Sequence, residues 1–82
     1  MSDAPAIPSD MSPDQLKAAR KRLGMSQDDM ARALRLGRDG ARTVRRWETE
    51  EGKPGHRGIP GPVEVLIETW LGFPVEELEI EL

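Results

Sequence analysis

Apolar residues recur three and four positions apart in four stretches of this chain, and this spacing places them on one face of an α-helix. The four sets are Leu16, Ala19 and Leu23; Met30, Ala31 and Leu34; Gly40, Val44 and Trp47; and Val63, Leu66, Ile67, Trp70 and Leu71. The pattern predicts an all-α fold, a compact arrangement of four to five short helices. Because each tryptophan lies on an apolar stripe, we expect both in the core.

Local signals mark where the first two helices begin and where the first one ends. Ser12 is followed by a proline and then by Gln15, which is the arrangement of a capping box. Gly24 supplies a left-handed stop after the first helix. Ser26 caps the second helix directly afterwards.

The later elements are less sharply marked. The third helix is expected from about Gly40 to Thr49 with Asp39 as its cap, and the fourth helix from Pro62. Between them the segment EEGKPGHRGIPG is too rich in glycine and proline for a regular element, and its His56 is expected to be exposed and without a role. In residues 73–82 glutamates alternate with apolar residues, which leaves a short helix and a strand both open.

These signals divide the chain into three parts. Residues 1–11 are rich in Ala, Pro, Ser and Asp without periodicity, so we expect a disordered arm. Residues 12–72 form the helical domain, and residues 73–82 form an acidic C-terminal segment.

The amino-acid composition excludes most kinds of catalytic and metal-binding site. The chain has 82 residues, no cysteine and one histidine, so disulfides, thiolate chemistry and Cys- or His-based metal sites are excluded. It shows no nucleophile–base set, phosphate-binding loop or acidic metal cluster. We therefore expect no catalytic residue, no metal, no cofactor and no small-molecule ligand. No run approaches the ~20 apolar residues of a membrane helix, and the N-terminus lacks a signal-peptide pattern; a cytoplasmic protein without membrane contact is expected.

The charges are distributed unevenly. Residues 11–47 carry ten Lys or Arg against four acids, a net charge of +6, whereas residues 48–82 carry two against nine, a net charge of −7. The overall charge of −3 therefore does not argue against a polyanionic partner. On the third helix, Ala41, Arg42, Arg45 and Arg46 fall opposite the apolar side. Such a run can be a plain solvated face, but it also has the geometry that fits the major groove of DNA.

Three stretches in register resemble a known family. The segments KAARKRLGMSQDDMARAL, ARTVRRWE and IPGPVEVLIETWL are similar to the lambda-repressor-like (Xre/Cro-type) helix-turn-helix domain of phage and bacterial regulators. One departure is that the stretch between Leu34 and Ala41 is about three residues longer than the usual turn. The resemblance implies a sequence-specific double-stranded DNA-binding regulator associated with the nucleoid. Its simplest action is that of a repressor that occludes a promoter by inserting the third helix into the major groove of an inverted-repeat operator.

The expected contacts follow from the third helix and the resemblance together. Arg42 and Arg46 are expected to bind guanine O6 and N7, with Ala41 beside them at the bases. The backbone contacts are expected from Gln27, Arg38, Thr43, Arg45, Lys53 and Arg57. The resemblance also implies a structural ion pair between Arg20 and Glu48.

A single module offers little discrimination against a genome of competing sites, so we expect a homodimer. Its interface is predicted in the fourth helix and in the C-terminal segment, through Phe73, Val75, Leu78 and Ile80; a frayed tail is the alternative. A second class of function is a protein-interaction module, for example an antitoxin whose C-terminal segment binds a partner protein. RNA binding is possible through the same basic face, but that face has no aromatic side chains on which single-stranded bases could stack.

Overall fold

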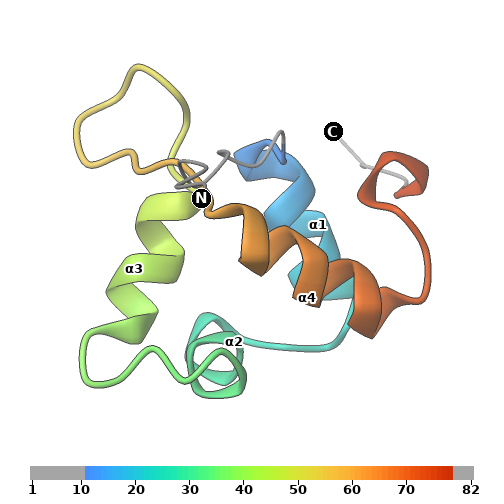
Figure 1. Cartoon of the computed structure of the whole chain (residues 1–82). Coiled ribbons are helices and arrows are strands. Elements are labelled where there is room, and N and C mark those ends of the chain that lie inside the picture. Colours follow the sequence, from blue (N-terminus) through green and yellow to red (C-terminus); the bar gives the residue numbers. More distant parts are fainter. Residues whose placement is uncertain (1–10, 79–82) are drawn as a thin grey trace, which may run out of the picture.

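The computed structural model describes residues 11–78 of the chain, and in this part the fold is all-α. Its elements are α1 (Pro13–Arg22), α2 (Gln27–Ala33), α3 (Gly40–Trp47), α4 (Gly61–Leu71) and a turn of 3-10 helix, η1 (Val75–Glu77). Figure 1 shows α4 crossing the middle of the molecule, with α1 behind it and α3 at one side. The predicted fold class is confirmed.

Capping boxes begin α1 and α2. The Ser12 hydroxyl accepts from the Gln15 amide at 3.1 Å, and the Gln15 side chain accepts from the Ser12 amide at 2.9 Å. Ser26 and Asp29 repeat this reciprocal pair at 3.0 Å in both directions. Each box satisfies two backbone N–H groups that have no partner within the helix. The sequence signals for both starts are confirmed.

α1 and α2 each end in a turn, and the two turns have the same hydrogen-bond pattern. After α1 the Met25 amide donates to a carbonyl of that helix at 3.0 Å, and after α2 the Leu36 amide does the same at 3.0 Å. This closure requires a left-handed residue just before it. That residue is Gly24 after α1, with φ 71°, and Arg35 after α2, with φ 59°. Among residues 11–78, Arg35 is the one residue other than glycine with a positive φ.

The third and fourth helices differ slightly from expectation. Asp39 precedes α3, but its side chain makes no capping hydrogen bond, since its backbone (φ −98°, ψ 23°) is not in the extended conformation of a helix cap. α3 ends at Trp47, two residues before the predicted Thr49. α4 begins at Gly61, one residue before the predicted Pro62.

The largest fully buried side chains of the core come one from each of the four helices. These are Leu16, Met30, Val44 and Ile67. The surrounding buried residues are Met11, Ala19, Ala31, Trp47, Ile59, Val63 and Val75. Trp47 is buried as predicted, whereas Trp70 is only partly buried and Leu66 is 43% exposed. The apolar stripe predicted on α4 is therefore wider than the face that the core covers.

The core extends beyond both predicted domain boundaries. Met11, which was assigned to the arm, is 5% exposed, and Val75, which was assigned to the C-terminal segment, is 4% exposed. The limits of 12–72 were therefore too narrow. An apolar side chain near each end of the described chain therefore belongs to the same core as the helices.

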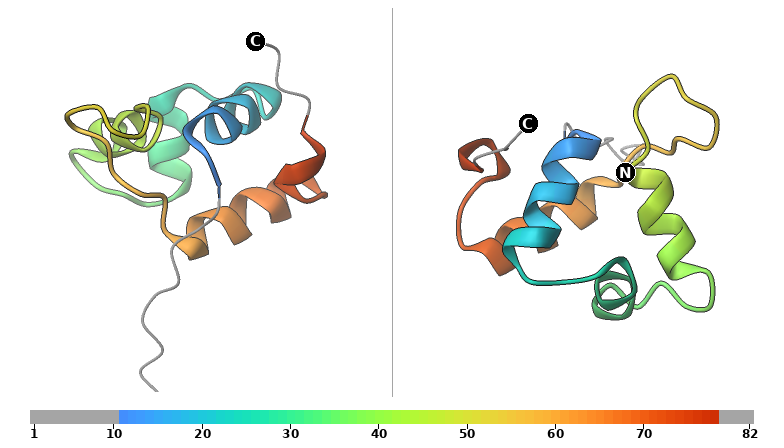
Figure 2. Two further views of the ribbon diagram at one scale, coloured as in Figure 1. Left: turned by 90° about the horizontal axis from the view of Figure 1, so that it is seen from above. Right: turned by 180° about the vertical axis from the view of Figure 1, so that it is seen from behind.

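The glycine- and proline-rich segment after α3 contains no helix up to Pro60, as predicted, and projects away from the helices in Figure 2; its last residue, Gly61, begins α4. The expectation for His56 is wrong. Its ring is half-buried, and Nδ1 lies 2.8 Å from the Thr49 carbonyl oxygen, a hydrogen bond that ties the loop to the residues just after α3. A second tie is the amide of Arg57, which donates to the Arg46 carbonyl at 3.2 Å.

Candidate nucleic-acid interface

α2 and α3 pack closely because small residues stand where they cross. A Cβ atom added to Gly40 would lie 2.7 Å from the Ala31 Cβ and 2.9 Å from the Leu36 Cβ. Both distances are shorter than real carbon contacts, so only glycine fits at this point of α3. The close approach fixes α3 on α2 and leaves the opposite side of α3 facing outward.

The outward side of α3 is strongly basic. Arg42 and Arg45 are exposed, while Ala41, Thr43 and Arg46 are half-buried at its edges. Arg20 pairs with Glu48 and Lys53 pairs with Glu50, whereas none of the α3 arginines forms an ion pair with a carboxylate within residues 11–78. Unpaired guanidinium groups on a rigid helix can form bidentate hydrogen bonds with an external acceptor.

A polar junction joins three helices behind this surface. Arg20 of α1 donates to Glu48 through Nε at 2.7 Å and Nη2 at 3.1 Å, and its Nη1 donates to the Met25 carbonyl at 3.0 Å. The two side chains are 12% and 6% exposed. The structure thus contains the ion pair that the resemblance implied, and it adds Gln27, whose Nε2 donates to Glu48 Oε1 at 3.3 Å. This junction holds the start of α2 against the end of α3.

Some of the residues expected to contact the DNA backbone already make internal hydrogen bonds, and others are exposed. Gln27 is anchored to Glu48, but its amide carries a second hydrogen. The Thr43 hydroxyl donates to the Asp39 carbonyl at 3.3 Å, so a phosphate contact would replace this internal bond. Arg38, Arg45 and Arg57 are exposed.

Lys53 is paired with Glu50 at 2.9 Å on the exposed loop. Hydrogen bonding between the two side chains, reinforced by their opposite charges, raises the pKa of Lys53 and lowers that of Glu50. A phosphate would therefore compete with the Glu50 carboxylate for Lys53. This pair lies on the surface, where such interactions contribute little to stability.

The predicted dimerisation residues do not form one exposed patch. Val75 lies in the core and cannot supply outer surface, which corrects the prediction. Phe73 is half-buried, Leu78 packs partly against the core, and Ile80 lies outside the described residues. Within residues 11–78, the large exposed apolar side chains are instead Val65, 63% exposed, and Leu66, 43% exposed, both on α4.

Comparison with known proteins gives one partial similarity. Over 39 residues, 48% of this chain, the sequence is 51% identical to the type II methyltransferase M.SsoII of Shigella sonnei. The matched stretch is 10% of that protein's length. No protein-family model matches the chain, and no solved structure matches it.

No three acidic or histidine side chains within residues 11–78 gather closely enough to hold a metal ion. None of the helices in that range has the length and hydropathy to cross a membrane.

One basic residue near the start of α3 is not identified by the sequence pattern. Arg32 follows Ala31, the residue at which α2 touches α3, and its side chain is exposed. The available signal was the pair of small residues, Ala31 and Gly40, but their contact could not be read without knowing how the two helices cross.

Proposed function

We propose that this chain is a sequence-specific double-stranded DNA-binding transcriptional regulator, most simply a repressor that occludes a promoter. The observation that carries the proposal is the row of unneutralised arginines on the outer side of α3, a helix held rigidly by its close contact with α2. An α-helix fits the major groove of DNA, and arginine bound to guanine O6 and N7 is the commonest specific contact there. The methyltransferase similarity covers a tenth of that protein and gives no argument for methyl transfer.

In this proposal α3 lies in the major groove with Arg42 and Arg46 at guanine bases. Ala41, at the edge of the same face, offers an apolar contact for a thymine methyl group. Arg45 binds a phosphate, and Gln27 uses its second amide hydrogen for another. The Arg20–Glu48 junction supports these contacts because it fixes where α2 begins relative to where α3 ends.

The proposed assembly is a symmetric dimer on an inverted repeat, with its two α3 helices about 34 Å apart. Of the two elements predicted to form the interface, α4 is the better supported, because Val65 and Leu66 are exposed while Val75 is buried. The same α4 face favours a second candidate, a protein-interaction module such as an antitoxin. Sedimentation of the wild type and of Leu66→Glu separates the two. A dimer that dissociates in the variant supports self-association, and a wild-type monomer at all concentrations favours a different partner.

The decisive experiment is selection of bound duplexes from a randomised pool by the full chain, followed by footprinting. Arg42→Ala and Arg46→Ala should each cost about 1–3 kcal/mol of discrimination at one base pair and leave the melting temperature unchanged. Arg45→Ala should weaken all sequences alike and reduce the salt slope by about one unit.

Arg22→Ala, at the exposed end of α1, is the matched control for loss of one positive charge. A wild-type chain that enriches no sequence would contradict the proposal. Unchanged footprints from both the Arg42 and the Arg46 variant would show that α3 is not the reading helix.

A further inference from the structure

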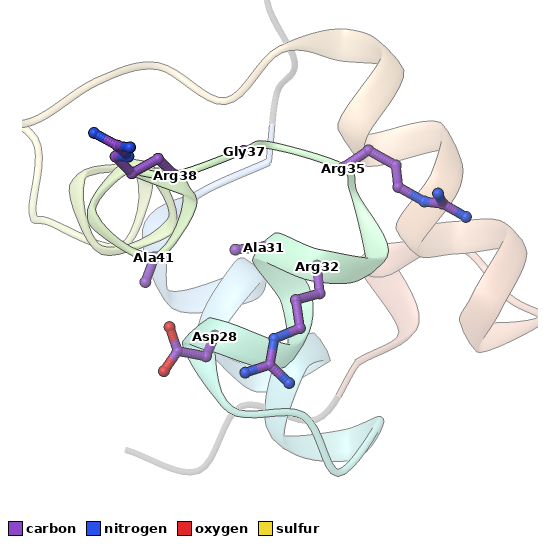
Figure 3. A pocket seen from close by; sticks show the side chains of 7 residues that line it. All are labelled: Asp28, Ala31, Arg32, Arg35, Gly37, Arg38 and Ala41. Atoms are coloured by element: carbon purple, nitrogen blue, oxygen red, sulfur yellow. The ribbon is translucent and has the colours of Figure 1, made fainter.

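An open cleft lies between α2 and the beginning of α3. Its volume is about 480 Å³, and it is lined by Asp28, Ala31, Arg32, Arg35, Gly37, Arg38 and Ala41 (Figure 3). Three of these residues are exposed arginines, none of them paired with a carboxylate within residues 11–78. Ala31 and Ala41 are among the lining residues, and their side chains are too short to fill the cleft.

The three guanidinium groups extend in different directions. In Figure 3 the side chains of Asp28, Arg32 and Ala41 point to one side of the cleft, while Arg35 and Arg38 extend away from that side and from each other. The arginines therefore do not converge on one small anion. Each arginine can bind a different group of an extended partner, or a different partner.

Ala41 identifies the side that faces DNA in the proposed complex. It stands between buried Gly40 and exposed Arg42, so it marks the edge of the reading face nearest to α2. The contact between Ala31 and Gly40 brings the residues that follow them, Arg32 and Ala41, to either side of the helix crossing. Arg32 thus projects next to the first turn of the reading helix.

We propose that Arg32 binds a backbone phosphate of the DNA beside the first base pair that α3 reads. This inference rests on the proposed function and adds a contact from α2 to it. The short side chain of Ala41 leaves the cleft open, so the sugar–phosphate backbone can approach α2 here. Asp28 lies one turn before Arg32 on the same face, and its carboxylate repels the phosphate. Arg32 offsets that repulsion.

The test compares single-charge variants of the full chain on the selected duplex over a range of salt concentrations. Arg32→Ala should raise Kd several-fold, reduce the salt slope by about one unit and leave the base preference unchanged. Arg32→Lys should retain the wild-type slope, since lysine binds phosphate as a point charge. Asp28→Asn should lower Kd on all sequences.

The matched control is Arg35→Ala, which removes the same charge from the same cleft but from a side chain that points elsewhere. It should change the slope much less than Arg32→Ala. Equal slope losses in the two variants, or no loss in Arg32→Ala, would overturn the phosphate contact while specific binding by the wild type still supports the proposed function. If Arg32→Ala leaves the salt slope of DNA binding unchanged but loses binding to an acidic peptide, the cleft binds a protein instead. Failure of the wild type to select any sequence would overturn the proposed function itself.

Discussion

Glu48 joins three helices through one carboxylate. It accepts two hydrogen bonds from Arg20 and one from Gln27, and it is almost completely shielded from water. In such a place the attraction between the charges is opposed by the cost of removing both from water. The pair is therefore more sensitive to the loss of one partner than to the loss of both.

Arg20→Ala and Glu48→Ala should each destabilise the fold by about 3–5 kcal/mol, because each leaves one shielded charge without its partner. The double variant should lose less than the sum of the two. Chemical denaturation followed by circular dichroism measures all four proteins. Additive losses would contradict a direct interaction between the side chains.

The capping box of α2 gives a dependence of stability on pH. Hydrogen bonds from the backbone and the hydroxyl of Ser26 hold the pKa of Asp29 below its ordinary value of 3.8. A lowered carboxyl pKa means that the folded state favours the ionised form, so this contribution is present above pH 3.8 and is lost as the pH falls through the lower folded-state pKa. Asp29→Asn should therefore reduce stability at pH 7, and the difference from wild type should shrink at pH 2.

Parallel denaturation curves for the wild type and Asp29→Asn at the two pH values measure this effect. Asp28→Asn, next to it and also exposed in the first turn of α2, is the matched control, since it keeps the capping box. A difference between wild type and Asp29→Asn that stays constant with pH would contradict the assignment.

At the residue scale, local features were predictable from sequence and tertiary ones were not. Ser12 and Ser26 could be assigned as caps because a capping box is complete within four residues. The hydrogen bond of His56 to Thr49 depends on the path of the whole loop, and the loop pattern does not define that path. Asp39 has a capping residue type, yet the backbone conformation of the preceding turn denies it the capping role.

At the scale of elements, α1 and α2 present a natural comparison between two identical turns. Gly24 closes the first at φ 71° and Arg35 closes the second at φ 59°. A side chain with a Cβ is strained in this region by roughly 1 kcal/mol, whereas glycine is not. The glycine identifies the first turn in the sequence. Residues 35–40 also have the composition of a turn, but an arginine gives no sign of the left-handed conformation that this position adopts.

Arg35→Gly should raise the melting temperature by about 4–8 °C, the shift expected for roughly 1 kcal/mol in a domain of this size. Gly24→Arg should lower it by a similar amount, since a Cβ at Gly24 meets no atom within 4 Å and the backbone conformation is the main source of strain. Thermal unfolding followed by circular dichroism measures both. Opposite signs are the expected outcome, and destabilisation by both variants would show that the Arg35 side chain contributes stabilising contacts.

At the scale of the whole molecule, residues near both ends of the described chain enter one core. The sequence predicted the four helices because their apolar spacing is local information. It did not place Met11 or Val75, since their burial depends on which part of the core the helices leave uncovered. The arginines of α3 were predictable as an outward face, whereas the position of Arg32 required the crossing of α2 and α3.

Removal of residues 73–82 should destabilise the monomer as well as any dimer. Burial of a valine side chain contributes about 1.5–3 kcal/mol, and the Val75 amide also donates to Glu68 at 2.9 Å. Chemical denaturation of the truncated chain at low concentration measures this loss, and Glu76→Ala, exposed on the same turn, is the matched control. Unchanged stability would contradict the packing of Val75.

The four central side chains, one from each helix, have a consequence for cooperativity. Helices of 7 to 11 residues are too short to persist alone in water, and the buried side chains of all four belong to one core. Opening any one helix exposes part of the common centre, so the central amides of all four should exchange their hydrogens with solvent through the same global event. α3 then presents its arginines only while the entire unit is folded. A loss of stability anywhere in the core lowers the concentration of binding-competent protein in proportion to the unfolded fraction.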